Sequence, residues 1–246
     1  MRKSGGVRTL FATNILWHDF GLQNSELNKL IIQELNLMRE RGNNEATLRT
    51  FNYYGGNSSW QSIAGLEKVS KGFDILRVSL EEAALSLILH SGYLLIPQRL
   101  DCLVLEDLWG NIIFEKGGYS APHIHGRGNT LWTGVYYPMD NNTPDLRKDI
   151  DIDHIIEYNS TSSLKSTDSG GDLILYDPAK DIKGQVSFEG MSTISQGREA
   201  KVTPTESLLL LFPAYLSHMV TPTLTDKVRY SISFSVNLKS KQIEEI

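Results

Sequence analysis

Two histidines form the first pattern in this sequence that could do chemistry. His123 and His125 stand two residues apart in the segment 122–126, Pro-His-Ile-His-Gly. In a β-strand, residues i and i+2 point to the same face, so this spacing aims two imidazoles at one point and turns Ile124 the other way, into packing. Imidazole is the commonest metal ligand among side chains, and the segment therefore indicates a metal site.

A third histidine and a late arginine extend the pattern. His218 and Arg229 both lie near the end of the chain. Two imidazoles from a short motif, one distant imidazole and a guanidinium together indicate a single metal ion with open coordination positions. The planar guanidinium would bind the carboxylate of a co-substrate through two parallel hydrogen bonds.

The segment 228–237 around Arg229 alternates strictly between apolar and polar residues. One face carries Val228, Tyr230, Ile232, Phe234 and Val236, and the other carries Arg229, Ser231, Ser233, Ser235 and Asn237. If the apolar face packs under helices, the polar face must look into a barrel, where it could hold a polar ligand. Without the histidines, the simpler interpretation is that Arg229 faces bulk water on an outer sheet.

The elements that position these residues change in kind along the chain. From Ser25, apolar residues recur every three or four positions until the glycine at position 42, which predicts a helix, and a second helix is predicted over about 73–91. After residue 100 the period becomes two. Strands are predicted at 103–109, 111–114, 131–137, 172–176, 206–212 and 227–237. The order predicts a mainly β fold, a double-sheet jelly roll with the N-terminal helices packed on one outer face.

We predict one domain over 1–246, with a helical leader at 1–99 and a jelly-roll core at 100–240. A long polar insert at 139–171 interrupts the strands, and loops of this length are usually functional lids or disordered insertions. The segment 53–62 reads as a turn-rich loop that carries three aromatic residues. Both segments are candidates for contact with the substrate.

Composition limits the function classes. With 40% hydrophobic and 22% charged residues among 246, the chain can bury a sizeable core, and its net charge of −5 argues against a nucleic-acid binder. The single cysteine, Cys102, excludes an internal disulfide framework and suits a reducing compartment, where we expect it to be buried. Neither a secretory signal nor an apolar run long enough for a membrane span is evident. We therefore expect a cytoplasmic protein.

With these pieces in place, the chain resembles the Fe(II)/2-oxoglutarate-dependent oxygenases, and more narrowly a branch of them found in bacteria and phages. Any one motif is weak, but the order and spacing of the motifs are fairly specific and run through most of the chain. The matching segments are Gly-Gly-x-x-x-Trp-Gln-Ser at 55–62, 123–126 with 131–137, the strand at 173–178 that ends in Tyr-Asp-Pro, and 202–213 with 218–220 and 229–231.

This resemblance implies a double-stranded β-helix that binds Fe(II), 2-oxoglutarate and O₂. His123 and His218 would be the first and last iron ligands. Arg229 would pair with the distal carboxylate of 2-oxoglutarate, assisted by Ser231, while Thr133 and Tyr136 could line the same pocket. The implied reaction is hydroxylation of a substrate C–H bond with release of succinate and CO₂.

One position departs from the family pattern. The wider superfamily places a carboxylate two residues after the first histidine, where this chain has His125. Three interpretations follow: His125 binds the metal and completes a three-histidine site, Asp177 supplies a carboxylate from another strand, or the position stays open to water or a halide. The i, i+2 spacing favours His125. Asp177 precedes Pro178 and more simply forms a turn.

Two other functions remain open at the level of sequence. One is a cupin-like three-histidine metalloenzyme that does not use 2-oxoglutarate, and the other is a non-catalytic jelly-roll binding module. The substrate, a small molecule or a peptide or protein side chain, is not indicated by the sequence, and neither is the oligomeric state.

Overall fold

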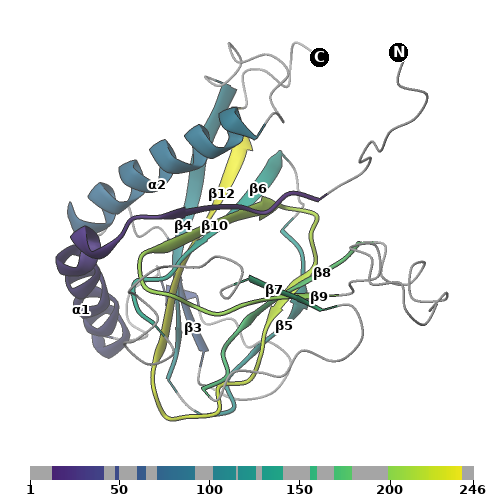
Figure 1. The fold of residues 1–246 in the computed structure, drawn as a ribbon. Helices are drawn as coiled ribbons and strands as arrows, with labels where there is room; N and C mark the ends of the chain where they lie inside the picture. Colours follow the sequence, from purple (N-terminus) through teal and green to yellow (C-terminus); the bar gives the residue numbers. More distant parts are fainter. Residues whose placement is uncertain are drawn as a thin grey trace, which may run out of the picture.

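Antiparallel strands of this chain pair into two sheets that face each other, and two helices cover the outer face of the larger sheet (Figure 1). The computed structural model describes residues 13–41, 48–49, 60–64, 71–91, 102–114, 116–125, 129–140, 156–159, 169–178 and 199–239. The prediction of a mainly β fold with helices on one outer face is confirmed.

The larger sheet has seven strands in the order β1-β10-β6-β12-β4-β3-β2, and the smaller sheet has five in the order β5-β11-β8-β9-β7. The bounds of the larger sheet are β1 Leu16–Asp19, β2 Leu48–Arg49, β3 Trp60–Ala64, β4 Leu103–Ile113, β6 Thr130–Tyr136, β10 Leu208–Pro213 and β12 Arg229–Leu238. Those of the smaller sheet are β5 Ser120–His123, β7 Ile156–Asn159, β8 Leu173–Tyr176, β9 Glu199–Val202 and β11 His218–Val220.

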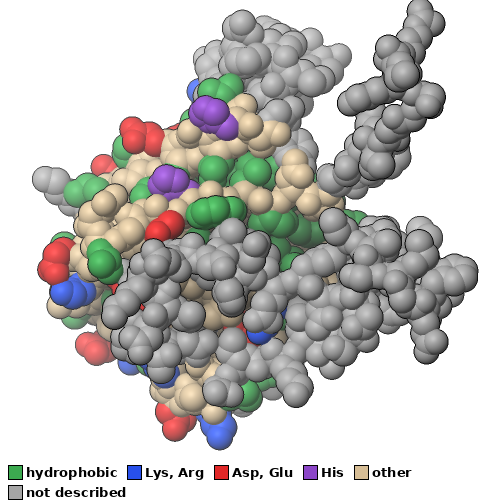
Figure 2. Space-filling model, in the orientation of Figure 1, with side chains coloured by type: hydrophobic (Ala, Val, Ile, Leu, Met, Phe, Trp, Pro, Cys, Tyr) green, Lys and Arg blue, Asp and Glu red, His purple; other side chains and the backbone are tan. Residues whose placement is uncertain are grey.

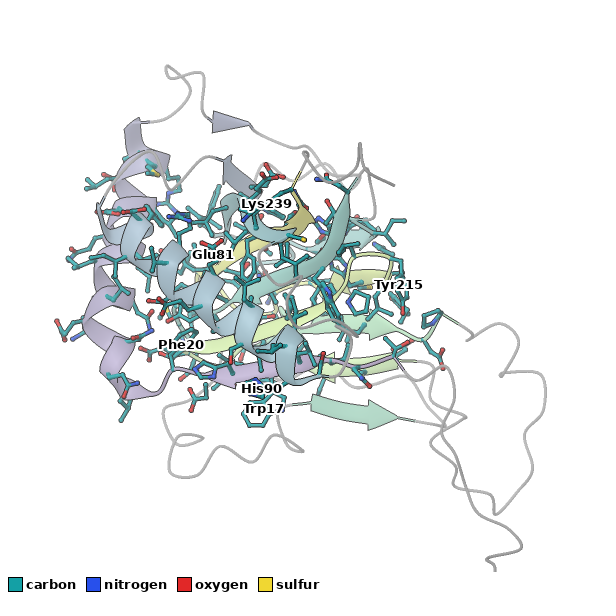
Figure 3. All side chains as sticks on the ribbon, turned by 90° about the horizontal axis from the view of Figure 1, so that it is seen from above. Trp17, Phe20, Glu81, His90, Tyr215 and Lys239 are labelled. Carbon is teal, nitrogen blue, oxygen red and sulfur yellow. The ribbon has the colours of Figure 1, made fainter. Side chains whose placement is uncertain are left out.

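Two long helices follow the predicted periodicity. A short 3₁₀ turn at Leu22–Asn24 leads into α1, Ser25–Arg41, and α2 spans Lys71–His90. Their buried positions recur at three- and four-residue intervals, as an amphipathic helix requires: Ile31 and Leu35 on α1, and Phe73, Leu76, Leu80, Ala84 and Ile88 on α2. Seen from above, α2 lies across the sheet, and a carboxylate oxygen of Glu81 accepts a hydrogen bond from the backbone N–H of Leu105 on β4 at 3.3 Å (Figure 3).

The main core lies between these helices and the larger sheet. The apolar face of β12 forms its floor, since Tyr230, Ile232, Phe234 and Val236 belong to the same buried cluster as the helix residues. The predicted division of β12 into a core face and an inner face is confirmed. A second cluster fills the space between the sheets and includes Leu175 and Phe212.

Gly134 on β6 shows how closely the core face is packed. The ring of Phe234 lies directly over this glycine, and a Cβ atom at position 134 would overlap three of the ring carbons. A glycine is therefore needed here because of close approach, rather than because of backbone conformation.

Several strands differ from those predicted. Residues 103–113 form one strand, β4, and Gly110 does not end it, because partners on both sides, Ile232 of β12 and Ile63 of β3, hold its backbone. The predicted loop at 53–62 ends in β3, and its residues 53–59 lie outside the described residues. The predicted insert at 139–171 contains β7, while its residues 141–155 and 160–168 also lie outside them.

The face seen in Figure 2 mixes hydrophobic, charged and other side chains, with hydrophobic ones along β1 beside α2. Trp17 on β1 is 40% exposed, whereas Cys102 is buried as expected. Within the ranges that the structure describes, neither helix combines the length and the hydropathy of a membrane-spanning segment.

Candidate metal centre

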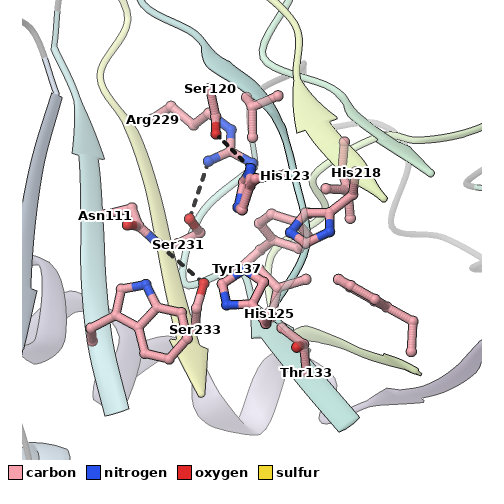
Figure 4. Close-up of a pocket in the computed structure, with 15 residues that line it drawn as sticks. Asn111, Ser120, His123, His125, Thr133, Tyr137, His218, Arg229, Ser231 and Ser233 are labelled. Atoms are coloured by element: carbon pink, nitrogen blue, oxygen red, sulfur yellow. Dashed lines mark hydrogen bonds between the residues drawn. The ribbon is translucent and has the colours of Figure 1, made fainter. Parts of the chain in front are cut away.

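Three imidazoles meet where the smaller sheet faces the larger one (Figure 4). His123 is the last residue of β5 and His218 the first residue of β11, and antiparallel pairing sets the two directly opposite each other. His125 follows two residues after His123, and the backbone N–H of His125 donates to the Ala214 carbonyl at 3.0 Å. The candidate ligand atoms of the three histidines all lie within 4.8 Å of one another.

Backbone carbonyls orient two of the three rings. Nδ1 of His123 lies 2.8 Å from the Ala121 carbonyl oxygen, and Nδ1 of His218 lies 3.0 Å from that of Leu216. A carbonyl can only accept, so each Nδ1 carries the proton and each Nε2 keeps its lone pair for another partner. Histidines that bind a metal through one ring nitrogen usually donate the N–H of the other nitrogen to such a carbonyl, which fixes the orientation of the ring.

Burial keeps these imidazoles neutral. It lowers the pKa of His125 to about 4 and that of His218 to about 3, and neighbouring imidazoles add to both shifts. The pKa of His123 is also lowered by burial, partly offset by its bond to the Ala121 carbonyl. Neutral imidazole is the form that binds a metal. Three neutral nitrogen donors at these separations suit a first-row divalent ion such as Fe(II).

The three imidazoles and Arg229 line a common cavity of about 60 Å³. The Arg229 side chain is only 2% exposed; its Nε donates to the Gly171 carbonyl at 2.8 Å, and Nη1 donates to the Ser231 hydroxyl at 3.1 Å. Burial lowers the pKa of Arg229, an effect opposed by Tyr137 and by the negative charge of Asp172. A guanidinium remains charged in proteins, so Arg229 contributes a buried positive charge to the cavity wall.

Two hydroxyl groups in the cavity wall make no hydrogen bond. Thr133 and Tyr137 are almost fully buried, and neither hydroxyl has a hydrogen-bond partner among the described residues. The Arg229 guanidinium lies 5.5 Å from the centroid of the Tyr137 ring, and its positive charge opposes the rise of the Tyr137 pKa. The Tyr137 hydroxyl makes no hydrogen bond of good geometry with this guanidinium. Burial nevertheless raises the pKa of Tyr137 to about 12, so the phenol stays protonated. Buried polar groups are normally paired, and these two fit a ligand with polar oxygens.

The prediction that Tyr136 lines the pocket was wrong. Tyr136 is fully buried on the helix side of β6, where its hydroxyl donates to Asn28 of α1 at 2.6 Å. Thr133, Val135 and Tyr137 line the cavity instead, because alternate residues of a strand share a face. Sequence reasoning missed Tyr137, although the same alternation, counted from Thr133, would have selected it over its neighbour.

Some of the other residues predicted for the site lie at the cavity, and others do not. Arg229, Ser231 and Thr133 line the cavity with the histidines, as the sequence predicts. Asp177 is described but does not belong to the group of residues that could hold a metal. Ile124, predicted to pack inward, is 53% exposed, because β5 ends at His123 and the chain leaves the sheet there. Sequence reasoning gave no role to Trp109, whose ring stacks on His125 at a centroid distance of 5.5 Å.

A family model described as "Putative 2OG-Fe(II) oxygenase" matches residues 107–235, just over half of the 246 residues. No curated protein sequence matches the chain.

Solved structures of similar fold cover most of the chain. A Pseudomonas putida prolyl-4-hydroxylase has a TM-score of 0.55 at 13% identity and covers 93% of this chain and 94% of its own. A Trichoplax adhaerens prolyl hydroxylase, in complex with a hypoxia inducible factor peptide fragment, has a TM-score of 0.56 at 16% identity, with coverages of 95% and 88%. The epimerase SnoN, in complex with Fe3+, alpha ketoglutarate and nogalamycin RO, has a TM-score of 0.55 at 11% identity, with coverages of 92% and 79%. At these identities the likeness shows the fold alone, a double-stranded β-helix.

Proposed function

The chain belongs to the 2OG-Fe(II) oxygenase family, and from that premise we propose that it hydroxylates a C–H bond of its substrate at a metal held by His123, His125 and His218. Fe(II), 2-oxoglutarate and O₂ are the cofactor and co-substrates of this family. When bound, they supply the oxidising chemistry, in which 2-oxoglutarate becomes succinate and CO₂ and the second oxygen atom of O₂ enters the substrate.

The ligand set that we propose consists of three neutral nitrogens. His123 and His218 would bind through Nε2, because their Nδ1 atoms are bonded to backbone carbonyls. His125 would take the position at which the wider superfamily has a carboxylate. The short distance between its ring nitrogens and those of His123 and His218, within 4.8 Å, supports this role. Asp177 does not belong to this group of candidate ligands.

Arg229 is the proposed anchor for the distal carboxylate of 2-oxoglutarate. Its guanidinium is a buried cation in the cavity wall, where a carboxylate would gain charge-assisted hydrogen bonds of roughly 1.5–3 kcal/mol in total. The Ser231 hydroxyl accepts from Arg229, which leaves its own O–H free to donate to the same carboxylate. Thr133 remains among the proposed binding groups, as the sequence predicts, and we add Tyr137; both hydroxyls are unpartnered among the described residues and both residues line the cavity.

The protonation states of these residues agree with this assignment. Tyr137 stays protonated at physiological pH because its pKa is raised to about 12, so it can donate to an anion rather than repel it. The histidines stay neutral because their pKa values are lowered, so protons do not compete with a metal for the imidazole nitrogens. Apolar side chains, among them Val135, Leu173 and Phe212, complete the wall and exclude water from the cavity.

We propose a small molecule, or a side chain of a peptide or protein, as the substrate. The structural neighbours include prolyl hydroxylases, one of them in complex with a peptide fragment, and an epimerase in complex with nogalamycin RO. The net charge of −5 gives no support to a nucleic-acid substrate.

One observation carries the proposal: the buried guanidinium of Arg229 lines the same cavity as three imidazoles. A cupin-like three-histidine enzyme without 2-oxoglutarate would have no use for a buried guanidinium behind its metal. A non-catalytic jelly roll would need neither the imidazole cluster nor the two unpartnered hydroxyls.

Anaerobic reconstitution with Fe(II), followed by O₂ and 2-oxoglutarate, tests the function without knowledge of the substrate, because such sites can turn over slowly when uncoupled. We expect succinate from the wild-type protein, a strong loss with Arg229→Gln, and none with His218→Ala. O₂ uptake without succinate would indicate the cupin-like enzyme. Failure to bind iron at all would indicate a binding module.

A further inference from the structure

The three imidazoles are held in two different ways. His123 and His218 lie on paired strands, and a backbone carbonyl fixes each ring through Nδ1. His125 lies beyond the end of β5, and its ring makes no hydrogen bond with any described residue. The rotation of an imidazole about its Cβ–Cγ bond is soft, so a ring without such a bond needs another restraint to keep a nitrogen on a metal.

Among the described residues, the His125 ring stacks on Trp109 with an interplanar angle of 25° and on His218, at 5.0 Å, with an angle of 12°. The His123 ring also lies 5.0 Å away, but it is tilted by 59°. Trp109 comes from the middle of β4, where Ser233 of β12 and Ala64 of β3 pair with it on either side. The indole is therefore mounted on a strand that is paired on both sides, next to a shift in the β4–β12 register, while the chain that carries His125 has left its own strand.

We propose that Trp109 is a positioning residue that holds His125 in its metal-binding orientation, the role that backbone carbonyls have for the other two histidines. The inference rests on the proposed function, since it takes all three imidazoles as ligands. It makes His125 the ligand most easily lost, because a stack restrains the plane of a ring but fixes neither of its nitrogens as the proton donor. Trp109 lines the same cavity but is not one of the candidate metal ligands.

Cobalt binding to the metal-free protein tests this role without turnover. The variants are Trp109→Leu, Trp109→Phe, His125→Ala and the double variant of Trp109→Leu with His125→Ala, and the readouts are the Co(II) dissociation constant and the visible absorption of bound Co(II), which responds to its ligands. We expect Trp109→Leu to weaken Co(II) binding about tenfold, as loss of a residue that orients a ligand typically does. Its spectrum should shift toward that of His125→Ala. Trp109→Phe keeps a ring for stacking and should recover most of both properties.

The double variant separates positioning from folding. If Trp109 acts through His125, Trp109→Leu should have no further effect once His125 is alanine. A matched control is Phe212→Leu, which removes the ring packed edge-on against His218 at 4.9 Å. We expect a smaller loss there, because the Leu216 carbonyl still orients His218.

Three results would overturn the inference, and they differ in what else they affect. An equal loss of affinity from Trp109→Leu with and without His125 would place the effect of Trp109 in the fold. An unchanged dissociation constant and spectrum in Trp109→Leu would show that the stack positions nothing. Both results leave the proposed ligand set standing, whereas wild-type Co(II) binding by His125→Ala would remove His125 from that set as well.

Discussion

The two faces of β12 carry different kinds of side chain and lie in different surroundings. One face packs Tyr230, Ile232 and Phe234 into the main core beneath the helices. The other places Arg229, Ser231 and Ser233 along the cavity beside the imidazoles. One strand therefore contributes to stability on one face and to binding on the other, and the parity of a residue number decides which.

Two neighbouring tyrosines repeat this division at the end of β6, where Tyr136 is the last residue of the strand and Tyr137 the next residue. Tyr136 points to the helices and bonds Asn28, while Tyr137 points into the cavity with no partner for its hydroxyl. If the two faces are independent, substitutions on the core face should change the free energy of unfolding, and substitutions on the cavity face should change ligand binding. The predictions below test that independence.

The largest effect on stability is expected for Phe234→Ala on the core face. Phe234 is fully buried, and its loss should lower the free energy of unfolding by about 3–5 kcal/mol because a cavity remains. Urea denaturation measures the change. The fraction that stays folded should bind 2-oxoglutarate as the wild type does, and weakened binding in that fraction would show that the two faces are coupled.

Arg229→Gln on the cavity face should have the opposite profile. Loss of the buried positive charge should weaken 2-oxoglutarate binding by about ten- to a hundred-fold, with a smaller change in stability than Phe234→Ala causes. Anaerobic calorimetry with Mn(II)-loaded protein measures the affinity. Ser235→Ala is a matched control, because Ser235 lies on the same face of β12 but does not line the cavity. Equal affinities for Arg229→Gln and Ser235→Ala would contradict the assignment of Arg229.

The imidazoles that share the cavity with β12 should add a pH dependence that the core face lacks. The pKa values of His125 and His218 fall from 6.5 to about 4 and about 3 on folding, so the unfolded chain binds protons that the folded protein does not. Their contribution to stability is therefore present above pH 6.5 and is lost as the pH falls toward 4 and then 3. Between pH 7 and pH 6 we expect a loss of roughly 0.5–1 kcal/mol for each histidine in metal-free protein.

Urea denaturation at several pH values, with a chelator present, checks this slope. His218→Gln should flatten it, whereas Phe234→Ala should lower the whole curve without changing its slope. A slope that survives replacement of both His125 and His218 would rule out these imidazoles as its source.

The paired substitutions Tyr136→Phe and Tyr137→Phe should give the smallest and most informative difference. Tyr136→Phe should lower the free energy of unfolding by about 1 kcal/mol, because it removes a buried hydrogen bond to Asn28. Tyr137→Phe removes a hydroxyl that has no partner, so stability should be unchanged or slightly raised, while 2-oxoglutarate binding should weaken several-fold. The same two assays, denaturation and calorimetry, apply to both variants. Identical results would contradict the division of β6 into two faces.

The sequence predicted correctly those helices and strands that have one apolar side along their whole length. The helix from Ser25 and both faces of β12 could be read from the sequence, because one side of each is buried along its whole length. Short strands such as β9 and β11 have too few residues to show a period, and pairing with distant partners forms them. Tyr136 was misassigned although the information was present, since Thr133 and Tyr136 cannot share a face of one strand.

Other features of the site depend on contacts that no local pattern contains. The convergence of His218 with His123 follows from the pairing of β11 with β5, which the resemblance implies but spacing alone does not. The stack of Trp109 on His125 joins two segments that no periodicity relates. The end of β5 at His123, which leaves Ile124 exposed, likewise reflects the Ala214 carbonyl that binds the next part of the chain.

A crystal structure of the protein grown anaerobically with Fe(II) and 2-oxoglutarate, with anomalous scattering recorded at the iron edge, tests the central claim most directly. The account predicts one iron about 2.1 Å from a nitrogen of each of His123, His125 and His218, and a 2-oxoglutarate carboxylate on Arg229 and Tyr137. Iron bound by Asp177 with His125 turned away, or a 2-oxoglutarate that avoids Arg229, would contradict it.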